Sequence, residues 1–458
     1  MRTIHSTKTM MVSLVLTLAF LFQPSEIIGQ SRINVTKGNS YSINSTSKNG
    51  VRTYHVKNKF QDFKIEYEGD ITVSNNDKDI VAISRGGFIE IKKTSFGTRR
   101  RIVIHADNGK LVKKYFVGWS EKSYKPKGKA WLAEILPEIV RTTTIAAESR
   151  VNRFYKRGGA NAVVSEVSKI KSDYVKSAYI KLLLKKNLST SNTVKAIEAT
   201  GKYIKSDHYV TQILKSNQKA FLKNDRTLNA YINATKSIKS DHYVTQILKT
   251  IIKDRTISDK QLNQLLEISK SIKSDHYRTQ ILTSIMDSRA LNANNISNIL
   301  SISNNIKSDH YKTQIIKKVL KNKNLQTKTY TKLMTMLDGV KSNHYITSVI
   351  KELMNRKLDR TAFNNLLNLI DNKVTSDHYM STLYTDLAKK NKLSDSQIIQ
   401  VFNSSKKNIK SSYSLSKVLI AFSSRVKESS SKLQASYNSV AKSIKSDTYY
   451  GRVMKAIN

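Results

Sequence analysis

Six histidines recur at one position of a repeated motif, and imidazole is a common metal ligand and proton carrier near neutral pH. A metal-binding ladder would need nitrogens within about 2.1 Å of one ion, whereas copies on stacked helices would lie roughly 8–10 Å apart. No acid or histidine recurs three or four residues away to complete a site. We therefore expect no metal and no cofactor, and interpret these residues as packing or hydrogen-bonding near helix starts, with surface recognition as the alternative. This histidine ladder comprises His208, His242, His276, His310, His344 and His378.

A lysine two places before the aspartate of the motif also recurs, and a row of lysines can bind a polyanion. Solvated loop residues would leave the same trace, and we favour that interpretation unless the lysines line one continuous face. Lys205, Lys239, Lys273 and Lys307 therefore join the histidines as a candidate recognition surface. The full lysine ladder is Lys171, Lys205, Lys239, Lys273, Lys307, Lys341, Lys410 and Lys445.

No pattern of catalytic residues accompanies the two ladders. The sequence contains no HExxH, no GxSxG and no Gly-rich phosphate loop. It also contains no cysteine, which excludes thiol nucleophiles, disulfides and Cys-based zinc sites. Because the acids that recur lie at predicted helix starts, the sequence predicts a protein that is not an enzyme.

Both ladders belong to a repeat whose period is 34 residues, rising to 35 near the end. In the copy Ser240-Asp-His-Tyr243, the serine can cap a helix, and the aspartate places negative charge at the positive end of the helix dipole. The motif and its replacements align at Asp173, Asp207, Asp241, Asp275, Asp309, Asn343, Asp377, Ser412 and Asp447.

Each repeat has the pattern of two helices. Tyr243, Ile247 and Ile251 give the first helix one apolar face, and a second helix begins near Ser258 and carries Leu262. Such a pair cannot bury its own apolar face, so successive pairs must stack. The tetratricopeptide and ankyrin signatures are absent. We therefore expect an αα-solenoid of HEAT-like type over 169–458, with about nine repeats.

The residues before the array predict a different architecture. Alternating apolar and polar runs are separated by Gly86-Gly87 and Asn108-Gly109, which are hairpin signals. Helical spacing begins at Trp131 and is interrupted at Gly158-Gly159. We expect an antiparallel β domain over 30–120, and a linker with connecting helices over 121–168, so that the fold class is α+β.

The first 29 residues have the pattern of a signal peptide. Arg2 and Lys8 precede the apolar run 10–22, which is too short to span a bilayer that needs about 20 residues. The lack of cysteine excludes a lipoprotein anchor, and no later segment predicts an integral span in the mature chain. We expect a soluble protein in a bacterial periplasm or outside the cell.

Part of the chain resembles a group of uncharacterised bacterial exported or envelope proteins, in which a small β region leads through helices into "SDY" repeats. The resemblance is best over 130–184, in Trp131-Leu-Ala-Glu-Ile-Leu-Pro-Glu-Ile-Val-Arg141, Gly158-Gly-Ala-Asn-Ala-Val-Val-Ser-Glu-Val167 and Ser172-Asp-Tyr-Val175. It departs at 142–146, where glycines are common in the group. Similar repeats occur in soluble parts of some membrane-bound antirepressor metallopeptidases, whose HExxH helix has no counterpart here. The resemblance implies export and a solenoid, and it carries over no catalytic residue.

The predicted fold and the net charge lead to two different functional expectations. The chain holds 79 Lys and Arg against 34 Asp and Glu, a formal net charge of +45. A solenoid surface favours a non-enzymatic binding or scaffold protein with a protein partner in the envelope or outside the cell. The large positive charge leaves open the alternative of an anionic envelope polymer, a membrane surface or a nucleic acid as partner.

Overall fold

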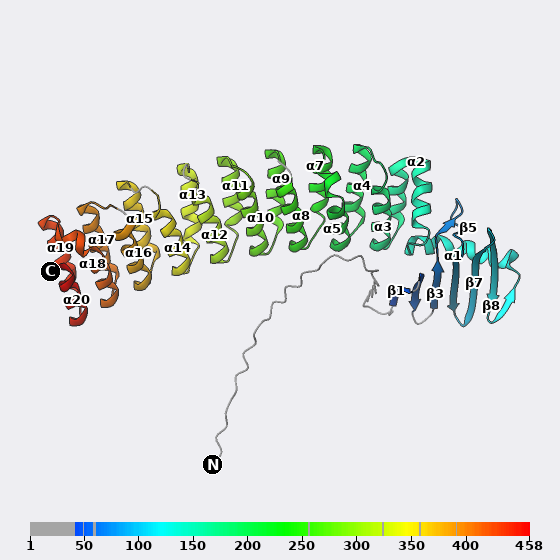
Figure 1. Ribbon diagram of the computed structural model, residues 1–458, viewed down its shortest axis with the longest axis horizontal. Coiled ribbons are helices and arrows are strands. Elements are labelled where there is room, and N and C mark those ends of the chain that lie inside the picture. The colour runs from blue at the N-terminus through cyan, green and yellow to red at the C-terminus, as the bar shows by residue number, and fades with distance from the viewer. Residues whose placement is uncertain are drawn as a thin grey trace, which may run out of the picture. The chain divides into compact units, whose positions relative to one another are not determined.

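The computed structural model describes residues 42–48, 50–57, 61–254, 257–322, 325–356, 359–390 and 392–458 (Figure 1). The predicted signal peptide, 1–29, lies outside these residues. The chain forms two compact units, Met1–Arg153 and Phe154–Asn458, so the predicted connecting segment 121–168 is divided between them. An antiparallel sheet followed by a long helical repeat confirms the predicted α+β class. Within the described ranges, every helix is too short or too polar to cross a bilayer.

The N-terminal unit contains a seven-stranded antiparallel sheet in the order β1-β2-β3-β6-β7-β8-β9, and a separate pair, β4-β5. Alternation explains the sheet, since Ile102 and Ile104 of β7 are fully buried while their neighbours are not. Asn108 and Gly109 both have positive φ, as the predicted tight turn between β7 and β8 requires. The hairpin predicted across Gly86-Gly87 is wrong, because β5 pairs with β4 whereas β6 pairs with β3 and β7. The strands are β1 (Ser42–Lys48), β2 (Val51–Lys57), β3 (Gln61–Glu68), β4 (Ile71–Val73), β5 (Ile80–Ile83), β6 (Phe88–Ser95), β7 (Thr98–Asp107), β8 (Lys110–Val117) and β9 (Ser120–Lys122).

The core of this unit joins the sheet to the first α-helix, α1 (Lys129–Thr142), which follows the short helix η1 (Tyr124–Gly128). The helical apolar spacing that begins at Trp131 becomes the buried face of α1, in one cluster with Ile65 and Ile91 of the sheet. The rings of Trp131 and Tyr115 lie 5.9 Å apart. Burial of these side chains is the main force that holds α1 on the sheet.

A buried ion pair crosses the same unit. Arg150 is fully buried and donates from Nε and Nη2 to the two carboxylate oxygens of Asp77, at 3.1 and 2.8 Å. Its Nη1 donates to the carbonyl of Val140 at 3.1 Å, and Arg153 donates to Asp77 at 2.5 Å. These bonds connect the turn between β4 and β5, which contains Asp77, to the carbonyl of Val140 in α1 and to Arg150 and Arg153 at the start of the next helix.

The stability of this ion pair should depend on pH. Burial by itself raises the pKa of Asp77, but the hydrogen bonds and charges of Arg150 and Arg153 outweigh burial and hold that pKa below its ordinary value. The contribution is therefore full above about pH 4, the usual aspartate range, and is lost as pH falls through the depressed pKa. We expect the difference in urea midpoint between the native chain and Asp77→Ala to shrink as pH falls from 6 to 3. A difference that stays constant would contradict this assignment.

The C-terminal unit is a two-row helical array (Figure 1). The helices that begin at the motif form one row of neighbours, and the second helices of the repeats form the other row. The helix that leads into the array departs from helical geometry at Gly158 and Gly159, where the sequence predicts a break. Its helices are α2 (Ala147–Lys169), α3 (Asp173–Leu184), α4 (Thr190–Tyr203), α5 (Asp207–Ser216), α6 (Gln218–Phe221), α7 (Asp225–Thr235), α8 (Asp241–Asp254), α9 (Asp259–Ser271), α10 (Asp275–Ser288), α11 (Ala293–Ser303), α12 (Asp309–Leu320), α13 (Thr327–Asp338), α14 (Asn343–Met354), α15 (Arg360–Lys373), α16 (Asp377–Lys390), α17 (Asp395–Asn408), α18 (Ser412–Lys427), α19 (Ser431–Ala441) and α20 (Asp447–Ile457).

The predicted apolar faces are the buried faces of the array. Ile247 and Ile251 of α8 are fully buried, and so is Leu262 of α9. Helices of each row also pack against the equivalent helices of the neighbouring repeats, so the array is stabilised repeat by repeat.

Candidate functional site

The aspartate of the motif joins each repeat to the next. Asp241 Oδ2 accepts hydrogen bonds from the backbone N–H groups of Lys273 and Ser274, at 3.0 and 2.7 Å. The same pair of bonds reaches from Asp207 to Lys239 and Ser240. The sequence pattern predicts only an interaction of this residue with the helix dipole, and the link between repeats comes from the structure alone. The equivalent bonds are made by Asp173, Asp275, Asp309 and Asp377.

One repeat uses an amide in place of the carboxylate. Asn343 Oδ1 accepts from the backbone N–H of Thr375 at 2.8 Å. Its Nδ2 donates to the hydroxyl of Thr375 at 3.0 Å. Thr375 stands where other repeats have the ladder lysine, so the added amide donor of Asn343 has an acceptor beside it. The two departures from the motif compensate each other.

The serine before the aspartate is a weaker cap than the sequence predicts. The Ser274 hydroxyl accepts from Tyr277 N at the long distance of 3.5 Å. Ser206, Ser308 and Ser342 lie at the cap position without a side-chain capping bond. The hydrogen bond from the backbone N–H of this serine to the aspartate of the preceding repeat recurs more regularly than the capping bond of its side chain.

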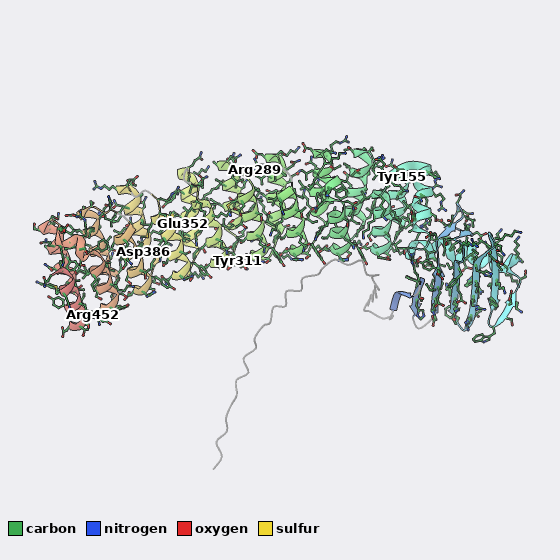
Figure 2. The ribbon with its side chains drawn as sticks, in the orientation of Figure 1. Tyr155, Arg289, Tyr311, Glu352, Asp386 and Arg452 are labelled. Atoms are coloured by element: carbon green, nitrogen blue, oxygen red, sulfur yellow. The ribbon has the colours of Figure 1, made fainter. Side chains whose placement is uncertain are left out.

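Most of the ladder lysines donate their backbone N–H groups to the aspartates that link the repeats, and their side chains are exposed. All eight ladder lysines are exposed and occupy equivalent positions just before a helix start. They therefore line one edge of the array, the edge at which Figure 2 labels Tyr311, whereas Arg289 marks the opposite edge. A second row of exposed lysines lies on the same edge, at the C-terminal ends of the second helices of the repeats. These are Lys202, Lys236, Lys270, Lys407 and Lys442.

The acids along this edge are already engaged. Each linking carboxylate accepts two backbone N–H bonds from the next repeat, as described above for Asp241. In the described part of the chain, no ladder lysine forms an ion pair, while Lys270 of the second row pairs with the exposed Glu267. The side chains of the ladder lysines are therefore exposed and, within these described ranges, outside any ion pair, although the linking carboxylates keep their negative charge along the same edge.

The histidine ladder begins the same row of helices and alternates with tyrosines. His242 contacts Tyr243 of its own repeat and Tyr277 of the next, with ring centroids 5.5 and 5.7 Å apart. The same alternation continues through His276, His310 and His344. The histidines are exposed and the tyrosines half-buried. His208 and His378, near the ends, contact Tyr209 and Tyr379 of their own repeats.

Hydrogen bonds hold His242 and His276 in place on both sides of the ring. Lys215 Nζ donates to Gln246 Oε1 at 3.1 Å, which turns Gln246 Nε2 toward His242 Nε2 at 2.8 Å. His242 Nδ1 lies 3.2 Å from the Tyr277 hydroxyl, within hydrogen-bond distance. The chain of bonds spans three repeats and occupies both ring nitrogens. His276 has the same two partners, Gln280 and Tyr311.

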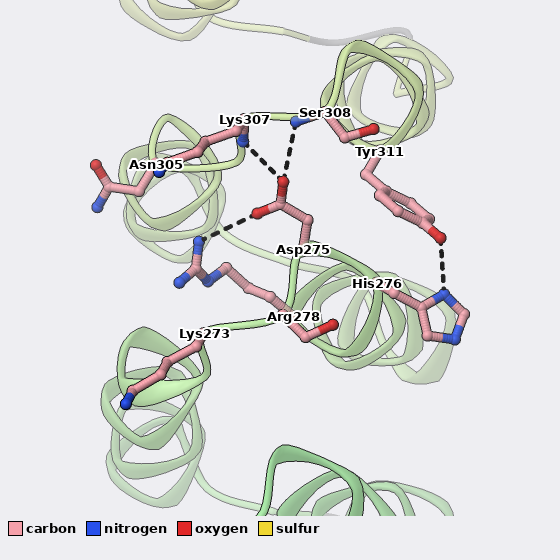
Figure 3. A pocket seen from close by; sticks show the side chains of 9 residues that line it. Lys273, Asp275, His276, Arg278, Asn305, Lys307, Ser308 and Tyr311 are labelled. Atoms are coloured by element: carbon pink, nitrogen blue, oxygen red, sulfur yellow. Dashed lines mark hydrogen bonds and ion pairs between the residues drawn. The ribbon is translucent and has the colours of Figure 1, made fainter.

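A shallow pocket of about 560 Å³ opens on this edge between α10 and α12 (Figure 3). Lys273, Lys307 and His276 line it together with Arg278, which is 8% exposed. The Arg278 guanidinium donates to the carbonyl of Ile272 and lies 3.8 Å from Asp275. This buried cation was not predicted from the sequence, although Lys176 and Lys312 occupy the same place, three residues after the aspartate, in other repeats. A charged residue on the apolar side of the helix was the available signal.

Comparison with known proteins adds little. No protein family and no curated protein matches the chain. A solved structure described as "Computational Design of Self-Assembling Cyclic Protein Homooligomers" is similar at 12% identity over 68% of this chain and 92% of its own. Its TM-score of 0.10 is too low to support any conclusion. The resemblance to exported repeat proteins stays a prediction.

Proposed function

We propose that this is an exported, non-enzymatic binding protein whose helical array holds a linear polyanion along the edge that carries the lysine ladder. The observation that carries the proposal is the placement of Lys205, Lys239, Lys273 and Lys307, exposed at equivalent positions along one edge. That placement supports the charge-driven alternative over the protein partner that the sequence favours.

The regular spacing supports a polymer rather than a folded protein as ligand. Each repeat offers the same lysine, histidine and tyrosine, and stacked helices lie roughly 8–10 Å apart. A ligand that uses several identical repeats has to present the same group several times in a line. A polymer with regularly spaced phosphates or carboxylates does so along its whole length, whereas a folded protein does so only where it is itself built from repeats.

The aromatic ladder gives the same edge a second kind of contact. Lys273 and Lys307 line the same pocket as His276 and Tyr311, but from the opposite side of Asp275 (Figure 3). A polymer that lies across this edge can therefore contact cations on one side and rings on the other. Export, proposed from the N-terminal pattern, would place this edge among the anionic polymers of the cell envelope.

The edge can be tested with two matched variants of the full chain. One variant carries Lys205→Gln, Lys239→Gln, Lys273→Gln and Lys307→Gln. The control carries the same charge loss at exposed lysines near the other ends of the motif helices: Lys219, Lys223, Lys260 and Lys321. Binding to fluorescent poly(glycerol phosphate) is measured by anisotropy from 50 to 300 mM salt.

We expect the edge variant to lose roughly tenfold or more in affinity at low salt, because each lysine that neutralises a phosphate releases a counterion. The slope of log affinity against log salt should fall by about 0.7 to 0.9 for each such lysine. The control variant should lose much less affinity, because it has the same lower net charge but keeps all the lysines of the ladder. Equal losses in the two variants, or binding that ignores salt, would exclude the edge as the binding site.

A further inference from the structure

Two neighbouring hairpin tips of the N-terminal unit expose large aromatic side chains. Phe96 lies in the turn between β6 and β7 and is 90% exposed, and Trp119 lies in the turn between β8 and β9 and is 87% exposed. The turns are adjacent because β7 pairs with both β6 and β8. Gly118 N also donates to Arg99 O at 2.8 Å, which ties the second turn to the start of β7.

These side chains contribute little to the fold. Trp119 lies under the guanidinium of Arg99, which is 4.4 Å from the ring centroid, and is otherwise largely in solvent. Phe96 itself has a positive φ of 49°, as does the Gly97 that follows it, and Trp119 follows Gly118, which also has a positive φ. The left-handed region favours glycine and asparagine, so the turn gains nothing from an aromatic residue at position 96. Neighbouring exposed aromatics on a soluble surface mark an interaction site.

The surroundings of the rings are positively charged. Lys93, Arg99 and Arg100 lie at the ends of β6 and β7, and Lys122 ends β9 beside Glu121. Arg101 contributes a further cation, although it pairs with Glu90 at 3.1 Å. The partner that fits the tip therefore combines negative charge with an apolar layer that can accept aromatic rings.

The shape of the tip distinguishes between anionic partners. Sites for small molecules and single glycan units are concave, and they bury most of the ligand. Phe96 and Trp119 project from turns with nearly their whole surface in solvent, so they suit a soft surface into which they can penetrate. Tryptophan and phenylalanine beside lysine and arginine are the residues that enter the headgroup region of membranes.

We propose that the aromatic tip, which comprises Phe96, Trp119, Arg99, Arg100 and Lys122, binds the surface of an anionic phospholipid bilayer. Phe96 and Trp119 enter the headgroup region, and the three cations contact lipid phosphates. The protein then associates with the membrane peripherally through its N-terminal unit. This inference does not depend on the polyanion proposal, which uses the other unit.

Trp119 itself is the reporter. The chain has two tryptophans, and Trp131 is only 5% exposed, so Trp119 accounts for the solvent-sensitive emission. The full chain is mixed with vesicles of phosphatidylglycerol and phosphatidylcholine. We expect a blue shift of the emission, protection from acrylamide, and quenching by lipids brominated near the headgroup.

Three variants locate the contact. Phe96→Ser should weaken partitioning by roughly tenfold, because it removes a buried ring from the bound state. Arg100→Gln and Lys122→Gln should each weaken it by about fivefold. The control is Val81→Ser, which changes an apolar residue of β5 that is 54% exposed. All four positions are exposed, and circular dichroism checks that each variant folds.

The net charge of the chain makes vesicle binding alone uninformative, so the depth of Trp119 decides. Sedimentation with anionic vesicles while Trp119 stays quenchable by acrylamide would overturn the proposal. So would equal partitioning of Phe96→Ser and Val81→Ser, or equally strong binding to pure phosphatidylcholine vesicles. A blue shift with bromolipid quenching that Phe96→Ser reduces would support it.

Discussion

Asp77→Ala is expected to destabilise the N-terminal unit by about 3–5 kcal/mol, because it leaves the buried Arg150 cation without its carboxylate. Arg150 is fully buried and directs two nitrogens at Asp77, so the substitution removes two charge-assisted hydrogen bonds from a buried cation. Domains of this kind are stable by only about 5–15 kcal/mol, so the loss is a large part of the total.

Urea unfolding followed by Trp131 fluorescence measures this effect, since Trp131 is buried in the core of the same unit. Glu121→Ala is the control, because it removes an exposed carboxylate from β9 and should change stability by less than about 0.5 kcal/mol. The double variant Asp77→Ala with Arg150→Met removes both charges and should recover part of the loss. If the double variant is no more stable than Asp77→Ala, an unpaired charge is not the cause.

Asp241→Ala is expected to weaken the junction between the repeats of α8 and α10 by about 1.5–3 kcal/mol, the usual value of a hydrogen bond to a charged group. The carboxylate holds the backbone N–H groups of Lys273 and Ser274, and alanine leaves both without that acceptor. Because stability in a solenoid is a sum of repeats and their junctions, one weak junction should let the array unfold in two steps.

Hydrogen exchange at the amides of Lys273 and Ser274 reports this junction directly, and urea unfolding reports its free energy. Asp287→Ala is the matched control, since Asp287 forms an exposed ion pair with Lys318 that should be worth less than about 1 kcal/mol. Asp241→Asn with Lys273→Thr copies the Asn343–Thr375 pair and should be more stable than Asp241→Ala. Unchanged exchange at both amides in Asp241→Ala would show that the aspartate does not link the repeats.

The repeat itself was readable from the sequence because its signal is local. Apolar residues such as Ile247 and Ile251 recur at helical spacing, and burial of one helical face requires that spacing wherever the helix lies. The alternation around Ile102 predicts a strand for the same reason. The positions of both ladders follow from the period, and so does the start of each helix at its aspartate.

The partners of those residues depended on the tertiary structure. Asp241 meets Lys273 and Ser274 from 32 and 33 positions away, and Arg150 meets Asp77 from 73 positions away. The sequence pattern gives the face on which a side chain lies, but not which distant group lies opposite it. The adjacency of Phe96 and Trp119 likewise required the pairing of β7 with both neighbours. Periodicity is fixed by burial along one element, whereas these contacts are fixed by packing between elements, and only the folded chain determines that packing.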